Sequence, residues 1–195
     1  MPRPGRTKPP RSDDDEGGDD VIVTDRLLLR PWREEDRAAF AAINADPAVM
    51  QYLGGPQTHA ESDAGVDRQM ALTAAGEPCF WVAERRADDA LLGFAGVKPI
   101  TFAAPFGPGY EVGWRLGKDH WGQGYASEGA RAALGHAFQV LELKEVFAFT
   151  VPANLASQAV MRRIGMIRVN GGDFDHPSLP EGHHLRRHVL YRAVR

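Results

Sequence analysis

The chain has 195 residues, of which 43% are apolar and 25% are charged, and its formal net charge is −3. This composition predicts one globular domain with a core, and no apolar run reaches the roughly 18 residues of a membrane span. The near-neutral balance argues against binding to nucleic acid or to a membrane surface. A single cysteine, Cys79, excludes an intramolecular disulfide, and without a secretory signal at the start we expect a cytoplasmic protein.

The first 20 residues differ in composition from the rest. Residues 1–20 are rich in proline, glycine and charge, and they contain no large apolar residue after Met1. Such a segment cannot bury enough apolar surface to offset the entropy lost on ordering. We therefore predict a disordered tail over 1–20 and a single folded domain over 21–195.

The first half of the domain predicts alternating strands and helices. A strand over 24–31 ends at a proline. Acidic residues at 34–36 open a helix that an Asp-Pro pair at 46–47 stops, and a second helix covers 60–75. Two strands, 80–83 and 91–97, then form a hairpin around an Asp-Asp turn.

The second half continues with a strand over 110–116 and a helix that runs from the 121–126 turn to about Val140. A strand over 146–151 follows, then a helix capped by Asn154, then a closing strand over 188–194. This order predicts an α/β or α+β domain in which helices cover both faces of one mixed sheet.

The glycine turn at 121–126 carries the clearest chemical signal. Gly122 and Gly124 permit positive φ and close approach of a ligand, and the helix N-terminus favours a phosphate. The alternative to a phosphate site is a tight turn that needs glycine only for its backbone conformation. A P-loop is excluded because no lysine follows Gly124, and a dinucleotide fingerprint would need glycine where Ser127 stands.

Three motifs stand in register along the chain. They are Thr-Asp-Arg-Leu-Leu-Leu-Arg-Pro at 24–31, the turn Trp-Gly-Gln-Gly-Tyr-Ala at 121–126, and a helix with Asn154 and Ser157 that ends in Gly165-Met166. The turn resembles the Gln/Arg-x-x-Gly-x-Gly/Ala signature of the GNAT superfamily of acetyl-CoA-dependent N-acetyltransferases, with tryptophan in the Gln/Arg place. The other two motifs are similar to those of the RimJ/RimL-type branch. The resemblance covers residues 24–195.

The resemblance implies a GNAT fold with a single, mostly antiparallel central sheet of about seven strands. Its fourth and fifth strands splay, and the pantetheine arm of acetyl-CoA lies between them. The implied contacts of that arm are strand backbone at Val112, Gly113, Trp114, Arg115 and Leu116. The pyrophosphate would sit on Trp121, Gly122, Gln123, Gly124, Tyr125 and Ala126. Asn154 and Ser157 would face the pantetheine or the thioester, although Asn154 can equally act as a helix cap.

The implied activity is direct transfer of an acetyl group from acetyl-CoA to a primary amine in a ternary complex. At neutral pH an N-terminal amine (pKa about 7.7–8.0) needs roughly 3.5 kcal/mol less deprotonation work than lysine (about 10.4). The acceptor is a protein N-terminus or a small-molecule amine, and the enzyme is a monomer or homodimer. A catalytically silent acyl-CoA-binding module and a nucleotide-binding interaction domain are the competing hypotheses.

For the acid–base chemistry, Glu111 is the predicted base, because it lies on the predicted cofactor strand where the family often places an acidic residue. The alternative interpretation is that Glu111 is an exposed strand residue paired with an arginine. Many members use a tyrosine seven residues after the Asn as the acid, but Met161 stands there. Ser157 is the substitute that the RimJ/RimL-type branch implies, with Tyr125 and water as further alternatives.

Two other features contain reactive or metal-binding residue types, but we expect structural roles for them. Cys79 lies in an apolar strand without a neighbouring histidine or carboxylate, so we predict a buried thiol. His183, His184 and His188 have a spacing that a metal can use, but they lack acidic or cysteine partners nearby. We predict no metal site and place these histidines in a loop beside the last strand, where the acceptor would enter.

Overall fold

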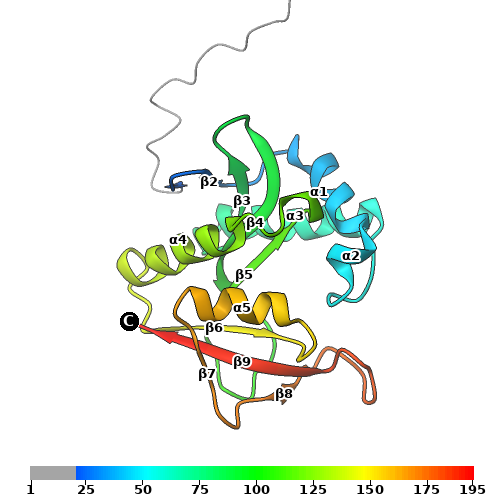
Figure 1. Ribbon diagram of the computed structural model, residues 1–195, viewed down its shortest axis with the longest axis vertical. Helices are drawn as coiled ribbons and strands as arrows, with labels where there is room; N and C mark the ends of the chain where they lie inside the picture. The colour runs from blue at the N-terminus through cyan, green and yellow to red at the C-terminus, as the bar shows by residue number, and fades with distance from the viewer. Residues whose placement is uncertain (1–20) are drawn as a thin grey trace, which may run out of the picture.

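The computed structural model describes residues 21–195, and the tail predicted over 1–20 lies outside them. These residues form a sheet in the order β1-β2-β3-β4-β5-β6-β9-β7, with β8 paired to β9 (Figure 1). The strands are β1 (Ile22–Val23), β2 (Leu27–Arg30), β3 (Phe80–Arg85), β4 (Ala90–Pro99), β5 (Tyr110–Leu116), β6 (Glu145–Thr150), β7 (Ile167–Arg168), β8 (Phe174–Asp175) and β9 (Arg187–Val194).

The predicted mixed, mostly antiparallel sheet is confirmed, but the expected number of about seven strands is too low. The sheet has nine strands, and every pair is antiparallel except β5 with β6. Three of the nine, β1, β7 and β8, have two residues each. Two residues are too few to establish an alternating pattern, which is why the sequence gives no sign of these strands.

Helices cover both faces of the sheet, as predicted. They are α1 (Asp36–Ala45), α2 (Pro47–Met50), α3 (His59–Ala74), α4 (Tyr125–Gln139) and α5 (Leu155–Arg163). On one face, α4 lies across β2, β4 and β5, and α5 lies beside it against β6 (Figure 1). On the other face, α1 and α3 pack together over β3 and β4 around Phe40, Val66 and Val82.

A buried ion network joins β2 to α1 and β3. The Arg30 guanidinium donates twice to Asp36, at 2.8 Å each, and its Nε donates to Glu84 at 2.7 Å. Asp36 also accepts the backbone N–H of Arg33, which fixes the first turn of α1. All three charged side chains are buried, so losing one partner would leave an uncompensated charge.

The parallel pair β5–β6 is the irregular point of the sheet. The two strands share a single register pair, Glu111 with Phe147, whereas β4 and β5 pair from Gly93–Leu116 to Pro99–Tyr110. Beyond Glu111 no residue of β5 forms a register pair with β6, so the two strands separate from there toward Leu116. The predicted splay, between the strands that the family counts as four and five, is confirmed here between β5 and β6.

Candidate active site

The glycine turn lies between a short 3-10 helix (Lys118–His120) and α4. Gly122 has φ +73° and Gly124 has φ +86°, so both occupy the left-handed region that favours glycine. Gly124 is also the N-cap of α4. The first N–H groups of a helix have no acceptor inside it, so this turn can accommodate an anion.

Side chains of the turn anchor it to the end of β5. The Trp121 indole N–H donates to the Leu116 carbonyl at 2.9 Å, and Gln123 Nε2 donates to the Asp119 carbonyl at 2.9 Å. The indole itself remains 48% exposed. Tryptophan in the family's Gln/Arg place thus ties the turn to the strand with the unpaired edge.

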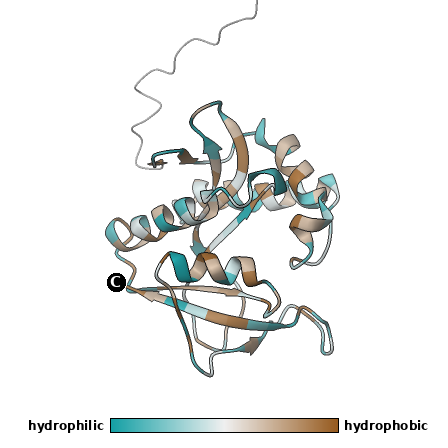
Figure 2. Cartoon of the chain, viewed as in Figure 1, coloured by the Kyte–Doolittle hydropathy of each residue, from teal (hydrophilic) through white to brown (hydrophobic). Residues whose placement is uncertain are grey.

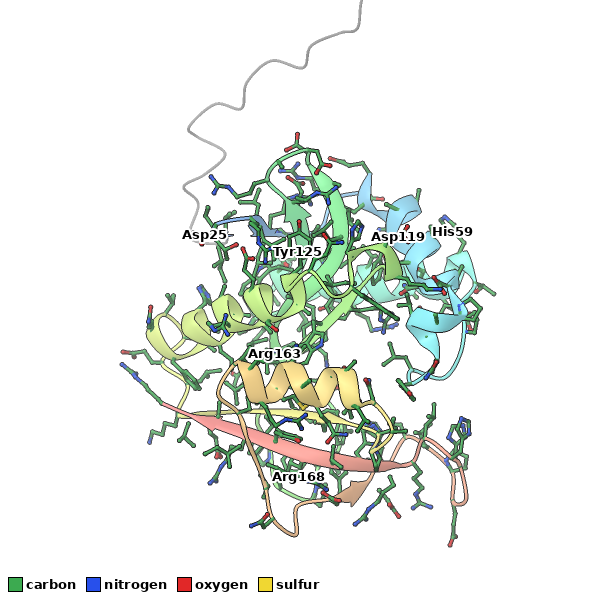
Figure 3. The ribbon with its side chains drawn as sticks, viewed as in Figure 1. Asp25, His59, Asp119, Tyr125, Arg163 and Arg168 are labelled. Atoms are coloured by element: carbon green, nitrogen blue, oxygen red, sulfur yellow. The ribbon has the colours of Figure 1, made fainter. Side chains whose placement is uncertain are left out.

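A second anchor comes from Arg26, about a hundred residues earlier in the chain. Its Nη1 donates to the Gln123 carbonyl at 3.0 Å, and its Nε donates to Glu128 at 2.7 Å. Its guanidinium also lies 4.4 Å from the centre of the Tyr125 ring. Figure 3 shows Tyr125 at the start of α4. Arg26 was not among the predicted site residues, although it stands inside the Thr-Asp-Arg-Leu motif.

The two faces of β5 have different surroundings. Val112 and Leu116 are buried in the main core with α4, and Trp114 packs against the same core. Glu111, Gly113 and Arg115 alternate with them and therefore point to the opposite face. Figure 2 shows the contrast with the neighbouring strand, since β4 is largely hydrophobic and parts of β5 are hydrophilic.

Glu111 is paired with a lysine and is mostly buried, so the alternative of an exposed glutamate paired with an arginine is wrong. Its Oε1 lies 2.6 Å from Lys98 Nζ, its register partner on β4, and only 16% of the Glu111 side chain is exposed. Burial raises the pKa of Glu111, while the Lys98 ammonium acts in the opposite direction. A carboxylate with a raised pKa is a better base near neutral pH than an ordinary glutamate.

Arg115 lies further along the same face as Glu111. Its Nη1 donates to the Asn44 side chain of α1 at 2.6 Å, and its guanidinium lies 5.4 Å from the centre of the Phe94 ring. Burial lowers the pKa of Arg115 to about 10. The Arg115 side chain thus faces α1, and its backbone is paired with Phe94 on β4.

Asn154 caps α5, as one of its two predicted roles requires. Its Oδ1 accepts the backbone N–H of Ser157 at 3.1 Å, and its Nδ2 donates to Thr150 Oγ1 at 3.1 Å. Met161, in the place of the family's tyrosine, is 2% exposed and belongs to the main core. The Ser157 side chain is half-buried in the first turn of α5.

A hydrogen bond from an arginine side chain to a backbone carbonyl links the two helices α4 and α5. Arg131 of α4 donates to the carbonyl of Arg163 at the end of α5, at 2.9 Å, and Figure 3 shows Arg163 between the two helices.

Cys79 is 2% exposed, with its sulfur 3.3 Å from Thr73 Oγ1, so the predicted burial of this thiol is confirmed.

The histidines fall into two groups. His183 and His184 stack on each other at 4.7 Å in the connection before β9, whereas His188 lies within β9. His188 belongs to a cluster with Phe149, Phe174 and His176, and burial lowers the pKa of both His176 and His188. Over residues 21–195 no three side chains are grouped as metal ligands, and no helix there is long and apolar enough to cross a membrane.

Residues 26–167 match the family model of the acetyltransferase (GNAT) domain. The chain belongs to the GNAT acetyltransferase family. It is 34% identical over 149 residues to the N-acetyltransferase YnaD of Bacillus subtilis. The matched region covers 75% of this chain and 82% of YnaD. It is 33% identical over 171 residues to the FsC-acetyl coenzyme A-N(2)-transacetylase of Aspergillus fumigatus, covering 83% and 73%.

Solved structures agree with this membership. A GNAT-family acetyltransferase from Bacillus anthracis superposes with a TM-score of 0.73 at 26% identity, covering 89% of this chain and 98% of that one. Mycobacterium smegmatis RimJ, solved with CoA-disulfide, superposes with a TM-score of 0.69 at 21% identity, covering 90% and 87%, and shows the shared fold. The chain is therefore an acetyl-CoA-dependent acetyltransferase of the GNAT family.

Proposed function

We propose that this acetyltransferase binds acetyl-CoA between β5 and β6 and transfers the acetyl group directly to a primary amine in a ternary complex. The observation that carries the proposal is the edge of β5 beyond Glu111, which has no register pair with β6 and leads to the glycine turn. Backbone N–H and C=O groups need hydrogen-bond partners, and the amides of a pantetheine arm supply both acceptors and donors. The N–H groups of residues 121–126 would receive the pyrophosphate.

The acceptor that fits this chemistry best is an α-amine, on a peptide N-terminus or on a small molecule. An α-amine is far more often neutral at physiological pH than a lysine side chain, so a single carboxylate is an adequate base. The name of the Aspergillus fumigatus relative, an N(2)-transacetylase that uses acetyl coenzyme A, also supports an amine acceptor.

Glu111 would take the proton from the attacking amine, directly or through one water. It lies where β5 and β6 separate, at the last paired position before the open edge. At 3.3 Å per residue the strand from Leu116 to Glu111 spans roughly 17 Å, so an arm that starts at the glycine turn reaches the base from there. Burial, which raises the pKa of Glu111, favours this role.

Ser157 would protonate the departing thiolate. It stands in the first turn of α5, and Met161 cannot donate a proton. Asn154 then supports Ser157 by holding its backbone, because the Asn154 side chain is already bonded to Ser157 and Thr150. None of the relatives found supports the alternative of a catalytically silent acyl-CoA-binding module.

The test is thioester turnover with a panel of amines that includes short peptides, amino acids, polyamines and aminoglycosides. We expect release of CoA that depends on the amine, with α-amines preferred over lysine side chains at neutral pH. Binding of acetyl-CoA without release of CoA for any amine would contradict the proposal and favour the silent module.

A further inference from the structure

Lys98 places an amine directly against the proposed base. Its Nζ lies 2.6 Å from Glu111 Oε1 and 5.3 Å from the centre of the Phe80 ring, and its side chain is 18% exposed. The two residues are register partners on β4 and β5, so the pair is built into the sheet. The other lysines among residues 21–195 are Lys118, in the short 3-10 helix, and Lys144, exposed before β6.

This geometry meets the condition that any acceptor amine must meet. A general base works on a proton within about 2.6–3.2 Å, or through one water. Lys98 Nζ already satisfies that distance, and it does so at the point where β5 and β6 separate. The same nitrogen also donates to the Pro99 carbonyl at 3.4 Å.

A tethered amine also has a large kinetic advantage over a free one. Well-oriented groups within one molecule react as if present at roughly 10⁵–10⁸ M, far above any amine in solution. Even a geometry that forfeits most of this advantage leaves Lys98 competitive with an acceptor at millimolar concentration.

We propose that Lys98 is an acetylation site on which the enzyme acts in cis, using its own bound acetyl-CoA. The proton of the Lys98 ammonium passes to Glu111, and the neutral nitrogen attacks the thioester carbonyl carbon. The new C–N bond forms as the C–S bond breaks, and the proton released on amide formation reaches the thiolate. One acetyl-lysine and one CoA result. This proposal rests on the proposed function, because it uses the same cofactor site and base.

Acetylation would change the site that performs it. The acetylated nitrogen carries no charge, so Glu111 loses the ion pair that it has in the unmodified chain. Each chain can react only once at this position, which distinguishes self-acetylation from turnover on an external amine. The modified and unmodified enzymes would therefore differ in the charge that an incoming amine meets.

The experiment incubates the full-length protein with acetyl-CoA and follows each lysine-containing peptide by mass spectrometry. We expect the Lys98 peptide to gain one acetyl group at least about 100-fold faster than the Lys144 peptide. The rate should not depend on protein concentration. Glu111→Gln should slow it by roughly 10²–10⁴-fold, while the slow chemical acetylation of Lys144 stays unchanged. Circular dichroism and melting curves show whether each variant is folded.

The outcomes separate this inference from the proposed function. If amines turn over but Lys98 stays unmodified, or reacts no faster than Lys144, self-acetylation is wrong and the proposed function stands. A rate that rises in proportion to protein concentration would also overturn the inference, because the reaction would then occur between molecules. If acetyl-CoA does not raise the melting temperature at millimolar concentration, both proposals fall together.

Discussion

The two faces of β5 show how one strand can serve the fold and the chemistry at once. On the face toward α4, Val112 and Leu116 are buried in the main core. On the opposite face, Glu111 pairs with Lys98 and Arg115 with Asn44, so charged groups occupy positions that a purely structural strand would fill with apolar ones. The difference teaches that one face of the strand packs into the core, whereas the other holds the buried charges to which we assign the proposed chemistry.

The glycine turn and the Glu111 face also differ in how their parts are connected. The turn uses six consecutive residues and is anchored from a distance by Arg26. The Glu111 face joins side chains from β3, β4, β5 and α1, which are far apart in the sequence. Variants on each side should therefore affect different steps, cofactor binding on one side and amine chemistry on the other.

The largest expected effect comes from Glu111→Gln. We expect kcat to fall by roughly 10²–10⁴-fold, the usual contribution of a general base. The affinity for acetyl-CoA should change little, because the carboxylate lies on the face of β5 opposite the main core. Steady-state kinetics and calorimetric titration on the same preparation measure the two quantities. An unchanged kcat would mean that water deprotonates the amine and that the enzyme acts by positioning.

The pH dependence of kcat/KM in the wild type and in the same variant tests the role of Glu111 further. In the wild type both Glu111 and the amine must be deprotonated, so log kcat/KM should fall with a slope of about two at low pH. Because burial raises the pKa of Glu111, its part of this limb should lie above the ordinary glutamate range near 4.3. In Glu111→Gln only the amine limb should remain, with a slope of about one. Identical slopes in both proteins would exclude Glu111 as the base.

Gly124→Val should have the next largest effect, and it should act on binding. The left-handed φ of +86° disfavours a β-branched residue, and a Cβ would lie 3.4 Å from Arg26 Nη2. We expect the Kd for acetyl-CoA to rise by at least about 100-fold, which is about 2.7 kcal/mol. The matched control is Gly171→Val, where φ is +70° in the connection before β8. If Gly124→Val binds acetyl-CoA normally, the turn is not the phosphate site.

Arg26→Met should weaken acetyl-CoA binding by about tenfold, or about 1.4 kcal/mol. The variant removes the bonds to the Gln123 carbonyl and Glu128 that hold the turn, but it leaves the N–H groups of the turn in place. Its effect is moderate because the guanidinium is about half exposed. Arg168→Met, which breaks an exposed pair with Asp173, is the control and should leave Kd unchanged. Equal losses in both variants would point to general electrostatics.

Ser157→Ala should have the smallest effect, a fall in kcat of less than about tenfold. A thiol with a pKa near 8.5 leaves as a thiolate without full protonation, so a lost proton donor is tolerated. The Asn154 cap survives because it uses the backbone of Ser157. A loss as large as that of Glu111→Gln would make Ser157 an essential acid.

Local sequence predicted the elements, and the resemblance predicted their arrangement. Helix α3 starts within one residue of its predicted position because Thr58 and Glu61 form a capping box, which is a local signal. The splay between β5 and β6 is not a local property, and it followed only from the family resemblance. The Arg30 network with Asp36 and Glu84 joins residues up to 54 positions apart, and no periodic pattern reveals such a contact.

The residues of the candidate site likewise fall into those that short motifs predict and those that depend on how distant strands pair. The positive φ of Gly122 and Gly124 and the Asn154 cap were predictable from short motifs. Lys98 was not, because its role depends on the register between β4 and β5, and a shift of one residue would turn it to the other face. The alternative that paired Glu111 with an arginine is wrong for this reason.

The most direct test of the central claim is to titrate isotope-labelled protein with acetyl-CoA and follow its backbone amide signals by NMR. We expect the largest shifts at 121–126 and along the open edge of β5 from Val112 to Leu116, with small changes around Phe174 and His188. Saturable shifts that leave residues 121–126 and the β5 edge unchanged would contradict it, because the cofactor would then bind elsewhere.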